Sequence, residues 1–113
     1  MAIDIDVTAW PRVTVVAPKG DLDMAVADEL RRTLTALIDG KQTRLVIDLA
    51  HVLYIDSSGL GALVAAMKHA RGAGGDIRLC ALQPAVHAIF EMTRLAKIMD
   101  IHPSRTEALA AWG

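Results

Sequence analysis

The sequence contains one cysteine, Cys80, among its 113 residues. A lone cysteine excludes an internal disulfide and a metal site built from several thiolates, and it fits a reducing cytoplasm. We expect Cys80 to be a small buried side chain in a strand. The four histidines also lack the i, i+4 spacing of a helical metal site, so we expect no metal.

Aromatic residues and excess charge are scarce as well. Aromatic residues make up 4% of the chain, and 12 basic and 13 acidic residues leave a formal net charge of -1. The low aromatic content argues against an aromatic platform for stacking bases. The balanced charge argues against the basic surface of a nucleic-acid-binding protein. We therefore expect no nucleic-acid partner.

Long apolar runs are missing too. No window of about 18 residues is free of charges and turn-forming residues, so no membrane span is expected. The N-terminus reads Met-Ala-Ile-Asp-Ile-Asp, without the basic and apolar regions of a signal peptide. The sequence thus predicts a cytoplasmic protein without a membrane partner.

Apolar residues are abundant, at 53% of the chain, which is enough for the core of one domain over residues 1–113. Alternating and β-branched segments predict strands, and apolar residues at helical spacing predict helices. The expected strands cover residues 3–8, 12–17, 44–49, 77–81 and 98–101. The expected helices begin near Val26, Leu60, Pro84 and Ser104, and the last runs through Trp112. This order predicts an α/β fold with a mixed sheet of four to five strands.

The most informative segment is the run Asp-Ser-Ser-Gly-Leu-Gly at residues 56–61. Aspartate and serine are preferred at helix N-caps, so capping of the second helix explains part of it. Three such residues in a row followed by two glycines exceed what one cap requires. We expect Gly59 and Gly61 to leave the surface bare, so that a partner can approach the hydroxyl groups.

A serine at a helix start can carry a phosphate, because free backbone N–H groups and the helix dipole favour an anion there. Phosphorylation adds about -1.5 to -2 charges at one point. Asp56 lies two residues from Ser58, and Asp21 and Asp23 are near if their loop lies at the same end of the sheet. Such a patch suits an electrostatic binding switch.

Together these segments resemble the STAS-domain anti-sigma factor antagonist family. The matching pieces are the 56–61 run, the Gly20–Asp23 loop, and the segment Ile77–Cys80 followed by Pro84–Val86 and Phe90. The resemblance covers almost the whole chain. It implies the STAS fold, a mixed sheet with helices packed mainly on one side.

The resemblance also implies a role in transcription regulation by partner switching. The unmodified antagonist would bind an anti-sigma factor that is a serine kinase, and so free the sigma factor. Phosphorylation of Ser58 would end binding, and a serine phosphatase would restore it. No cofactor is implied, and we expect a monomer. The expected partner-binding residues are Asp21, Asp23, Met24, Asp56, Ser57, Gly59, Leu60 and Gly61.

One position departs from the family pattern and bears on the choice of partner. Family members often carry bulkier polar or aromatic residues after the Gly-x-Leu-Asp loop, where this chain has Met24, Ala25 and Val26. We expect Met24 to lie in a loop and to contact the partner.

Two other functions compete with this hypothesis. The first is a STAS-like scaffold or sensor component that never cycles through a kinase. The second is a small hydrolase or nucleotide-binding protein, but a hydrolase elbow needs glycine two residues before its serine, where Ile55 and Asp56 stand. We expect no catalytic residues and no enzyme activity.

Overall fold

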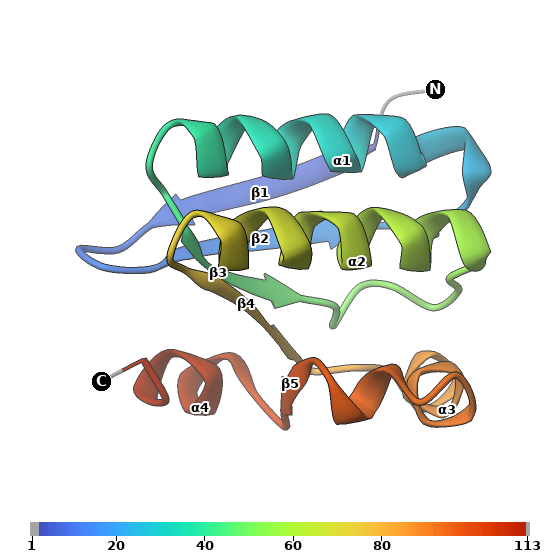
Figure 1. Cartoon of the computed structure of the whole chain (residues 1–113). Coiled ribbons are helices and arrows are strands. Elements are labelled where there is room, and N and C mark those ends of the chain that lie inside the picture. The colour runs from blue at the N-terminus through green and yellow to red at the C-terminus, as the bar shows by residue number, and fades with distance from the viewer. Residues whose placement is uncertain (1–2, 113) are drawn as a thin grey trace.

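The structure is a computed structural model that describes residues 3–112, so the ends of the predicted 1–113 domain lie outside the described residues (Figure 1). Strands and helices alternate along most of the chain. In order they are β1 (Asp4–Ala9), β2 (Thr14–Lys19), α1 (Met24–Asp39), β3 (Arg44–Asp48), α2 (Ser57–Gly72), β4 (Asp76–Cys80), α3 (Pro84–Met92), the 3₁₀ helix η1 (Leu95–Lys97), β5 (Asp100–His102) and α4 (Arg105–Ala110).

The strands form one five-stranded sheet in the order β1-β2-β3-β4-β5. β1 and β2 are an antiparallel hairpin, and each later strand runs parallel to the one before it. Helical connections carry the chain back between the parallel strands, as this arrangement requires. The predicted mixed α/β sheet is therefore confirmed.

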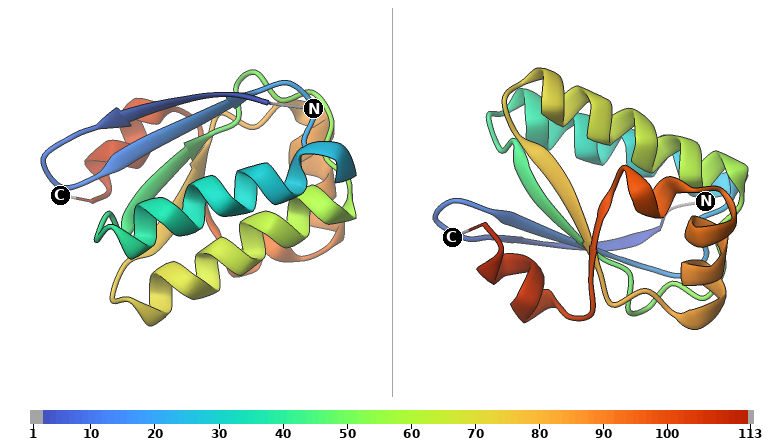
Figure 2. Two further views of the ribbon diagram at one scale, coloured as in Figure 1. Left: turned by 90° about the horizontal axis from the view of Figure 1, so that it is seen from above. Right: turned by 60° about the horizontal axis from the view of Figure 1, so that its bottom comes forward.

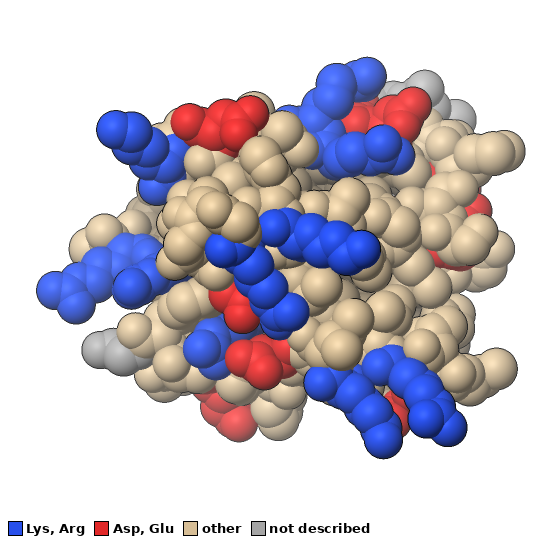
Figure 3. All heavy atoms as spheres, viewed as in Figure 1, with Lys and Arg blue, Asp and Glu red and all other residues tan. Residues whose placement is uncertain are grey.

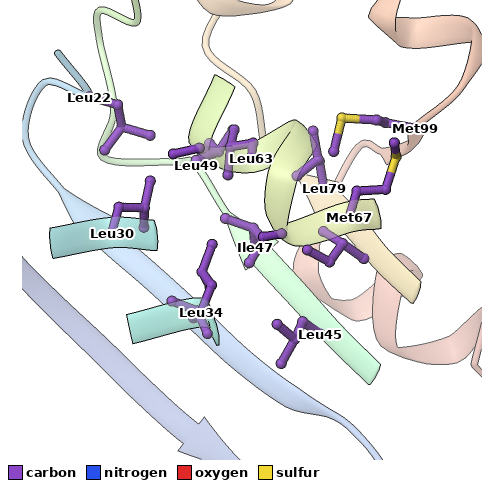
Figure 4. Close-up of a cluster of buried hydrophobic side chains, with 14 of the residues drawn as sticks. Leu22, Leu30, Leu34, Leu45, Ile47, Leu49, Leu63, Met67, Leu79 and Met99 are labelled. Atoms are coloured by element: carbon purple, nitrogen blue, oxygen red, sulfur yellow. The ribbon is translucent and has the colours of Figure 1, made fainter. Parts of the chain in front are cut away.

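The main core lies between the sheet and the helices α1 and α2. Leu30 and Leu34 of α1 and Leu63 of α2 are fully buried against Ile47 and Leu79 of the sheet (Figure 4). Each such side chain stabilises the fold by about 1.5–3 kcal/mol through burial. Val86 and Phe90 of α3 join the same cluster, so three helices share one core.

α4 covers the opposite face of the sheet, as Figure 2 shows in its right-hand view. Its Ala108 packs with Val15, Val46 and Cys80 in a second, smaller cluster. The Arg105 Nε donates to the Asp48 carboxylate at 2.9 Å and so fixes the start of α4 at the sheet. Helices thus lie mainly, but not only, on one side, as the resemblance implied.

The second strand begins and ends two residues later than predicted. Pro18, the first residue after the predicted strand, lies inside β2 and pairs with Ile5 of β1. Pairing with β3 stops at Val16, so Pro18 has a neighbouring strand on one side only. Proline is tolerated in a strand at such a position, which explains why it does not end the strand.

The C-terminal elements also differ from their prediction. The last strand begins at Asp100, because its register on β4 starts with Arg78 opposite that residue, and Ile98 instead ends η1. Ser104 Oγ accepts from the Glu107 N–H at 3.2 Å, which confirms the cap of α4. The helix stops at Ala110 rather than running through Trp112, whose ring stacks under the guanidinium of Arg78 at 4.3 Å.

Cys80 is fully buried at the end of β4, as predicted. Burial, assisted by the nearby Asp48 carboxylate, raises the pKa of the Cys80 thiol to about 12, while Arg105 acts in the opposite direction. The thiol is therefore neutral and inert in the folded protein at neutral pH.

This raised pKa makes folding stability depend on alkaline pH. The unfolded thiol ionises near its ordinary value of about 8.5, so the folded state loses stability as pH rises from there towards about 12. Urea unfolding measured between pH 8 and pH 11 should show stability falling more steeply for the native chain than for Cys80→Ala. Parallel pH profiles for the two proteins would show that ionisation of Cys80 does not oppose folding.

Candidate functional site

The site is formed where two loops, far apart in sequence, run side by side at the N-terminal starts of α1 and α2. Leu22 pairs with Ile55 in an isolated parallel bridge. The Leu22 N–H donates to the Tyr54 carbonyl at 2.9 Å, and the Asp56 N–H donates to the Leu22 carbonyl at 3.2 Å. The first loop therefore lies at the same end of the sheet as residues 56–61, which meets the condition for Asp21 and Asp23 to be near Ser58.

The Asp56 carboxylate joins the starts of both helices. Its Oδ1 accepts from the Gly59 N–H at 3.0 Å and caps α2, while its Oδ2 accepts from the Met24 N–H at 3.0 Å. Asp23 caps α1 by accepting from the Ala25 N–H at 3.0 Å. Backbone N–H groups in the first turn of a helix have no partner within the helix, so these bonds satisfy donors that would otherwise be left free. The loop aspartates are therefore structural as well as acidic.

Gly59 does not leave the surface bare, and that expectation was wrong. The residue is buried, and a Cβ at its position would lie 2.2 Å from the carbonyl oxygen of Leu22. Only glycine lets the first turn of α2 approach the neighbouring loop this closely. Gly61 is exposed with open space around it, so the same expectation fits that residue.

Ser57 and Ser58 occupy the first two positions of α2, directly after the cap. Ser57 is exposed and Ser58 is half-buried. The first hydrogen bond within the helix is donated by the Leu60 N–H to the Asp56 carbonyl at 2.9 Å. The N–H groups of both serines therefore have no hydrogen-bond partner within the helix, and they lie at the positive end of the helix dipole.

Exposed apolar side chains border this helix start. Met24 is 78% exposed, but it lies in the first turn of α1 rather than in a loop, because Asp23 and Asp56 cap the helix there. The loop before Asp56 adds Leu53 and Tyr54, which are 69% and 52% exposed. Neither of these two residues was predicted from the sequence. The apolar run at residues 52–55 could have indicated them. In this loop Val52 and Ile55 turn into the core, and the two residues between them remain exposed.

An acidic hollow of about 460 Å³ lies on the α1 side of the site. Asp4, Asp21 and Asp23 line it, with Lys19 as the one cation among the described lining residues. Lys19 forms an ion pair with Asp6 at 2.9 Å, and this hydrogen bond and charge raise the pKa of the lysine. Leu60, the remaining predicted contact, is half-buried and packs against the core.

Neither a metal cluster nor a membrane-spanning helix occurs in the part of the chain that the structure describes. No group of three histidine, cysteine or acidic side chains comes together there in a way that could hold a metal ion. No helix in residues 3–112 is both long and apolar enough to cross a membrane. Two of the histidines instead pair singly with acids, His69 with Asp39 at 2.7 Å and His87 with Glu91 at 3.7 Å.

The two glycines of the motif should respond oppositely to substitution. Gly59→Ala forces a methyl group against the Leu22 backbone and should destabilise the fold by about 1–3 kcal/mol. Gly61→Ala, at an open helical position, should stabilise it by about 0.5–1 kcal/mol. Urea unfolding of both variants measures this difference. A Gly59→Ala protein as stable as the native chain would contradict the close approach.

Substitutions of the capping aspartates should rank by the number of hydrogen bonds lost. Asp56→Ala loses two hydrogen bonds to helix N–H groups and should lower the free energy of unfolding by about 2 kcal/mol. Asp23→Ala loses one such bond and should lower it by about 1 kcal/mol. Asp56→Asn keeps one acceptor oxygen but turns the other into a donor, so we expect about 1 kcal/mol. Thermal or urea unfolding gives the order, and equal losses for Asp56→Ala and Asp23→Ala would refute the shared cap.

The sequence and the structure of this chain are similar to those of known proteins. The STAS domain family matches residues 4–108. The anti-sigma F factor antagonist of Paenibacillus polymyxa is 31% identical over 110 residues, which cover 96% of this chain and 94% of that protein. An anti-sigma factor antagonist from Mycobacterium paratuberculosis has a similar structure, with a TM-score of 0.88 and 30% identity over 96% of this chain and 92% of that one.

More distant structures share the fold. SpoIIAA, an anti-sigma factor antagonist, superposes in its unphosphorylated form with a TM-score of 0.74 and 17% identity, covering 96% of both chains. The phosphorylated form from Bacillus gives a TM-score of 0.76 and 20% identity, covering 97% of this chain and all of that one. The match over residues 4–108 spans both loops, all five strands and most of α4. The chain belongs to the STAS domain family.

Proposed function

We propose that this protein is an anti-sigma factor antagonist whose binding to a partner kinase is switched off by phosphorylation of Ser58. The observation that carries the proposal is the position of Ser58 in the first turn of α2, between the Asp56 cap and the buried Gly59. Relatives that span nearly the whole chain are named anti-sigma factor antagonists. The partner is an anti-sigma factor with serine kinase activity, and a serine phosphatase resets the switch.

The helix start can carry the phosphate without refolding. The N–H groups of Ser57 and Ser58 stand ahead of the helical ladder, where an anion is favoured by free donors and by the helix dipole. The surrounding frame is held by the Leu22–Ile55 bridge and by the two hydrogen bonds to Asp56. The modification therefore changes charge at a rigid surface rather than the fold.

The surface around Ser58 has the composition of a contact area. Met24, Leu53 and Tyr54 supply exposed apolar area, and Asp21 and Asp23 supply acidic groups at one edge. Interfaces commonly combine an apolar centre with a polar rim. The matching face of the kinase carries apolar side chains at its centre and basic ones opposite the aspartates. Exposed Ser57 and Gly61 belong to this contact area.

The proposal assigns binding rather than catalysis to the protein. It needs no cofactor on this chain, because ATP and the catalytic groups belong to the kinase. It places the protein in the cytoplasm, where the sigma factor and its partners act. A role as a non-cycling scaffold differs in one respect, namely that Ser58 would stay unmodified.

Variants of Ser58 should separate charge from loss of the hydroxyl group. Ser58→Asp puts a carboxylate into a partly desolvated contact beside Asp56, and burying an unpaired charge costs several kcal/mol. A loss of about 2.7 kcal/mol lowers affinity about a hundredfold, so we expect at least that for Ser58→Asp and nearly native affinity for Ser58→Ala. Calorimetric titration against the purified kinase measures both constants.

Phosphate mapping and unfolding provide the controls. After incubation with the kinase and ATP, mass spectrometry should find phosphate on Ser58 in the native chain and none in Ser58→Ala. Ser57→Ala is the matched variant and should still be phosphorylated. Phosphate on Ser57 alone, or equal kinase affinity of the Ser58→Ala and Ser58→Asp proteins, would refute the proposal. Cooperative unfolding lost in Ser58→Asp would show a conformational switch instead.

A further inference from the structure

An open apolar groove of about 300 Å³ lies between the turn that joins β1 to β2 and the end of α4. It is lined by Trp10, Pro11, Arg12, Val13, Leu109 and Trp112. Both tryptophans of the chain are among these residues, although they come from opposite ends of the sequence. The groove precedes the amino end of β2, whereas Ser58 lies beyond the carboxyl end of the parallel strand β3 (Figure 1). The groove and the candidate site are therefore at opposite ends of the sheet.

The β1–β2 turn presents Trp10 in a fixed position. The Trp10 N–H donates to the Val13 carbonyl at 2.8 Å, which closes a turn with only Pro11 and Arg12 between them. The proline ring fixes one backbone dihedral angle of this turn. Trp10 is nevertheless 50% exposed. Tryptophan and arginine are the residue types most enriched among those that dominate the binding energy of protein interfaces, so this turn has the composition of a contact point.

The end of α4 forms the other wall of the groove. Leu109 and Trp112 are half-buried and pack against the smaller core cluster. The guanidinium groups of Arg78 and Arg44 lie over the Trp112 ring, at 4.3 Å and 5.5 Å from its centroid, and so hold the indole in place. Because that ring already stacks with protein groups and the remaining walls are aliphatic, the groove suits an apolar side chain better than a flat nucleic-acid base.

Positive charge borders the groove. Arg12 belongs to its wall and, with Lys41 and Arg44, also lines an adjoining hollow of about 450 Å³ between the β1–β2 turn and the loop after α1. All three cations are exposed, and none forms an ion pair with another described residue. No acidic side chain is among the described residues that line either hollow. In Figure 3, basic side chains gather at the left-hand end of the molecule, where the β1–β2 turn and the end of α1 lie in Figure 1.

We propose that this groove binds an acidic segment of a partner protein that carries a large apolar side chain. The apolar side chain fills the groove between the two tryptophans, and neighbouring carboxylates pair with Arg12, Lys41 and Arg44. Such charge complementarity selects the partner, and arginine can meet a carboxylate with two parallel hydrogen bonds. A second copy of the chain is a poor occupant of a symmetric contact here, because the same cations would face one another. The site is independent of the proposed function at Ser58.

Tryptophan fluorescence of the full chain tests this inference, because both indoles line the groove. The probe is the synthetic peptide DDELFEED, which contains no tryptophan, at an ionic strength of about 0.15 M, where distant charges are screened. The emission should change saturably, with a Kd below about 1 mM. Amide NMR signals should shift at residues 9–13 and 108–112 and stay unchanged at residues 56–61. The peptide DDESSEED keeps the charges without the apolar pair and should bind at least about tenfold more weakly.

Two variants in the turn and one matched control separate specific from nonspecific binding. Trp10→Ala removes an apolar wall and Arg12→Glu turns attraction into repulsion, so each should raise the Kd measured by NMR at least about tenfold. Both residues are exposed, so the melting temperatures should stay close to that of the native chain. Arg32→Glu makes the same change of charge at an exposed position of α1 outside both hollows and should leave the Kd within about threefold.

Four results would overturn the proposal. The first is the absence of fluorescence changes and amide shifts at about 10 mM DDELFEED. The second is nonspecific attraction, shown by equal losses of affinity in Arg12→Glu and Arg32→Glu or by equal binding of the two peptides. The third is tighter binding of single-stranded oligothymidylate than of the peptide at the same residues, which would assign the groove to a nucleic acid. The fourth is concentration-dependent self-association that is lost in Trp10→Ala, which would assign it to a second copy of the chain.

Discussion

The carboxylate of Asp56 is the interaction on which the candidate site depends. One oxygen accepts from the first turn of α2 and the other from the first turn of α1, so a single side chain holds two helix starts together. The helices pack their apolar faces on the same side of the sheet. Because both begin at this carboxylate, the positions of Met24 and Ser58 relative to each other follow from it. The acidic group beside Ser58 is therefore first of all a structural element.

The contacts around Leu22 and Gly59 make the site rigid. Leu22 is fully buried and its backbone forms hydrogen bonds with Tyr54 and Asp56, while Gly59 lets the helix lie directly against that backbone. A loop tied down in this way has little room for a conformational response to a phosphate. Its exposed groups instead present charge and apolar area in a constant arrangement. For the proposed phosphorylation of Ser58, this favours an effect on the contact with a partner over a change of fold.

The two ends of the molecule differ in charge although the chain is nearly neutral overall, at -1. Asp4, Asp21 and Asp23 line the hollow beside the start of α1, and Arg12, Lys41 and Arg44 line the one beside its end. The helix dipole has the opposite sense, since its positive end lies at the acidic groups. Each hollow thus carries charge of the sign that the adjacent helix terminus attracts.

The sequence by itself determined the order of elements, the mixed sheet and the family, because apolar periodicity, caps and the 56–61 motif are local patterns. It also predicted Ser58 at a helix start, since Asp56 and the serines are capping residue types. Only the tertiary structure decided that Gly59 is buried against Leu22, that Met24 begins α1, and that Leu53 and Tyr54 face outward. The hollow between the β1–β2 turn and the loop after α1 could not be predicted from the sequence either. Each of these features depends on contacts between segments distant in sequence, and such contacts are set by the register of the sheet and the packing of the helices on it rather than by local residue type.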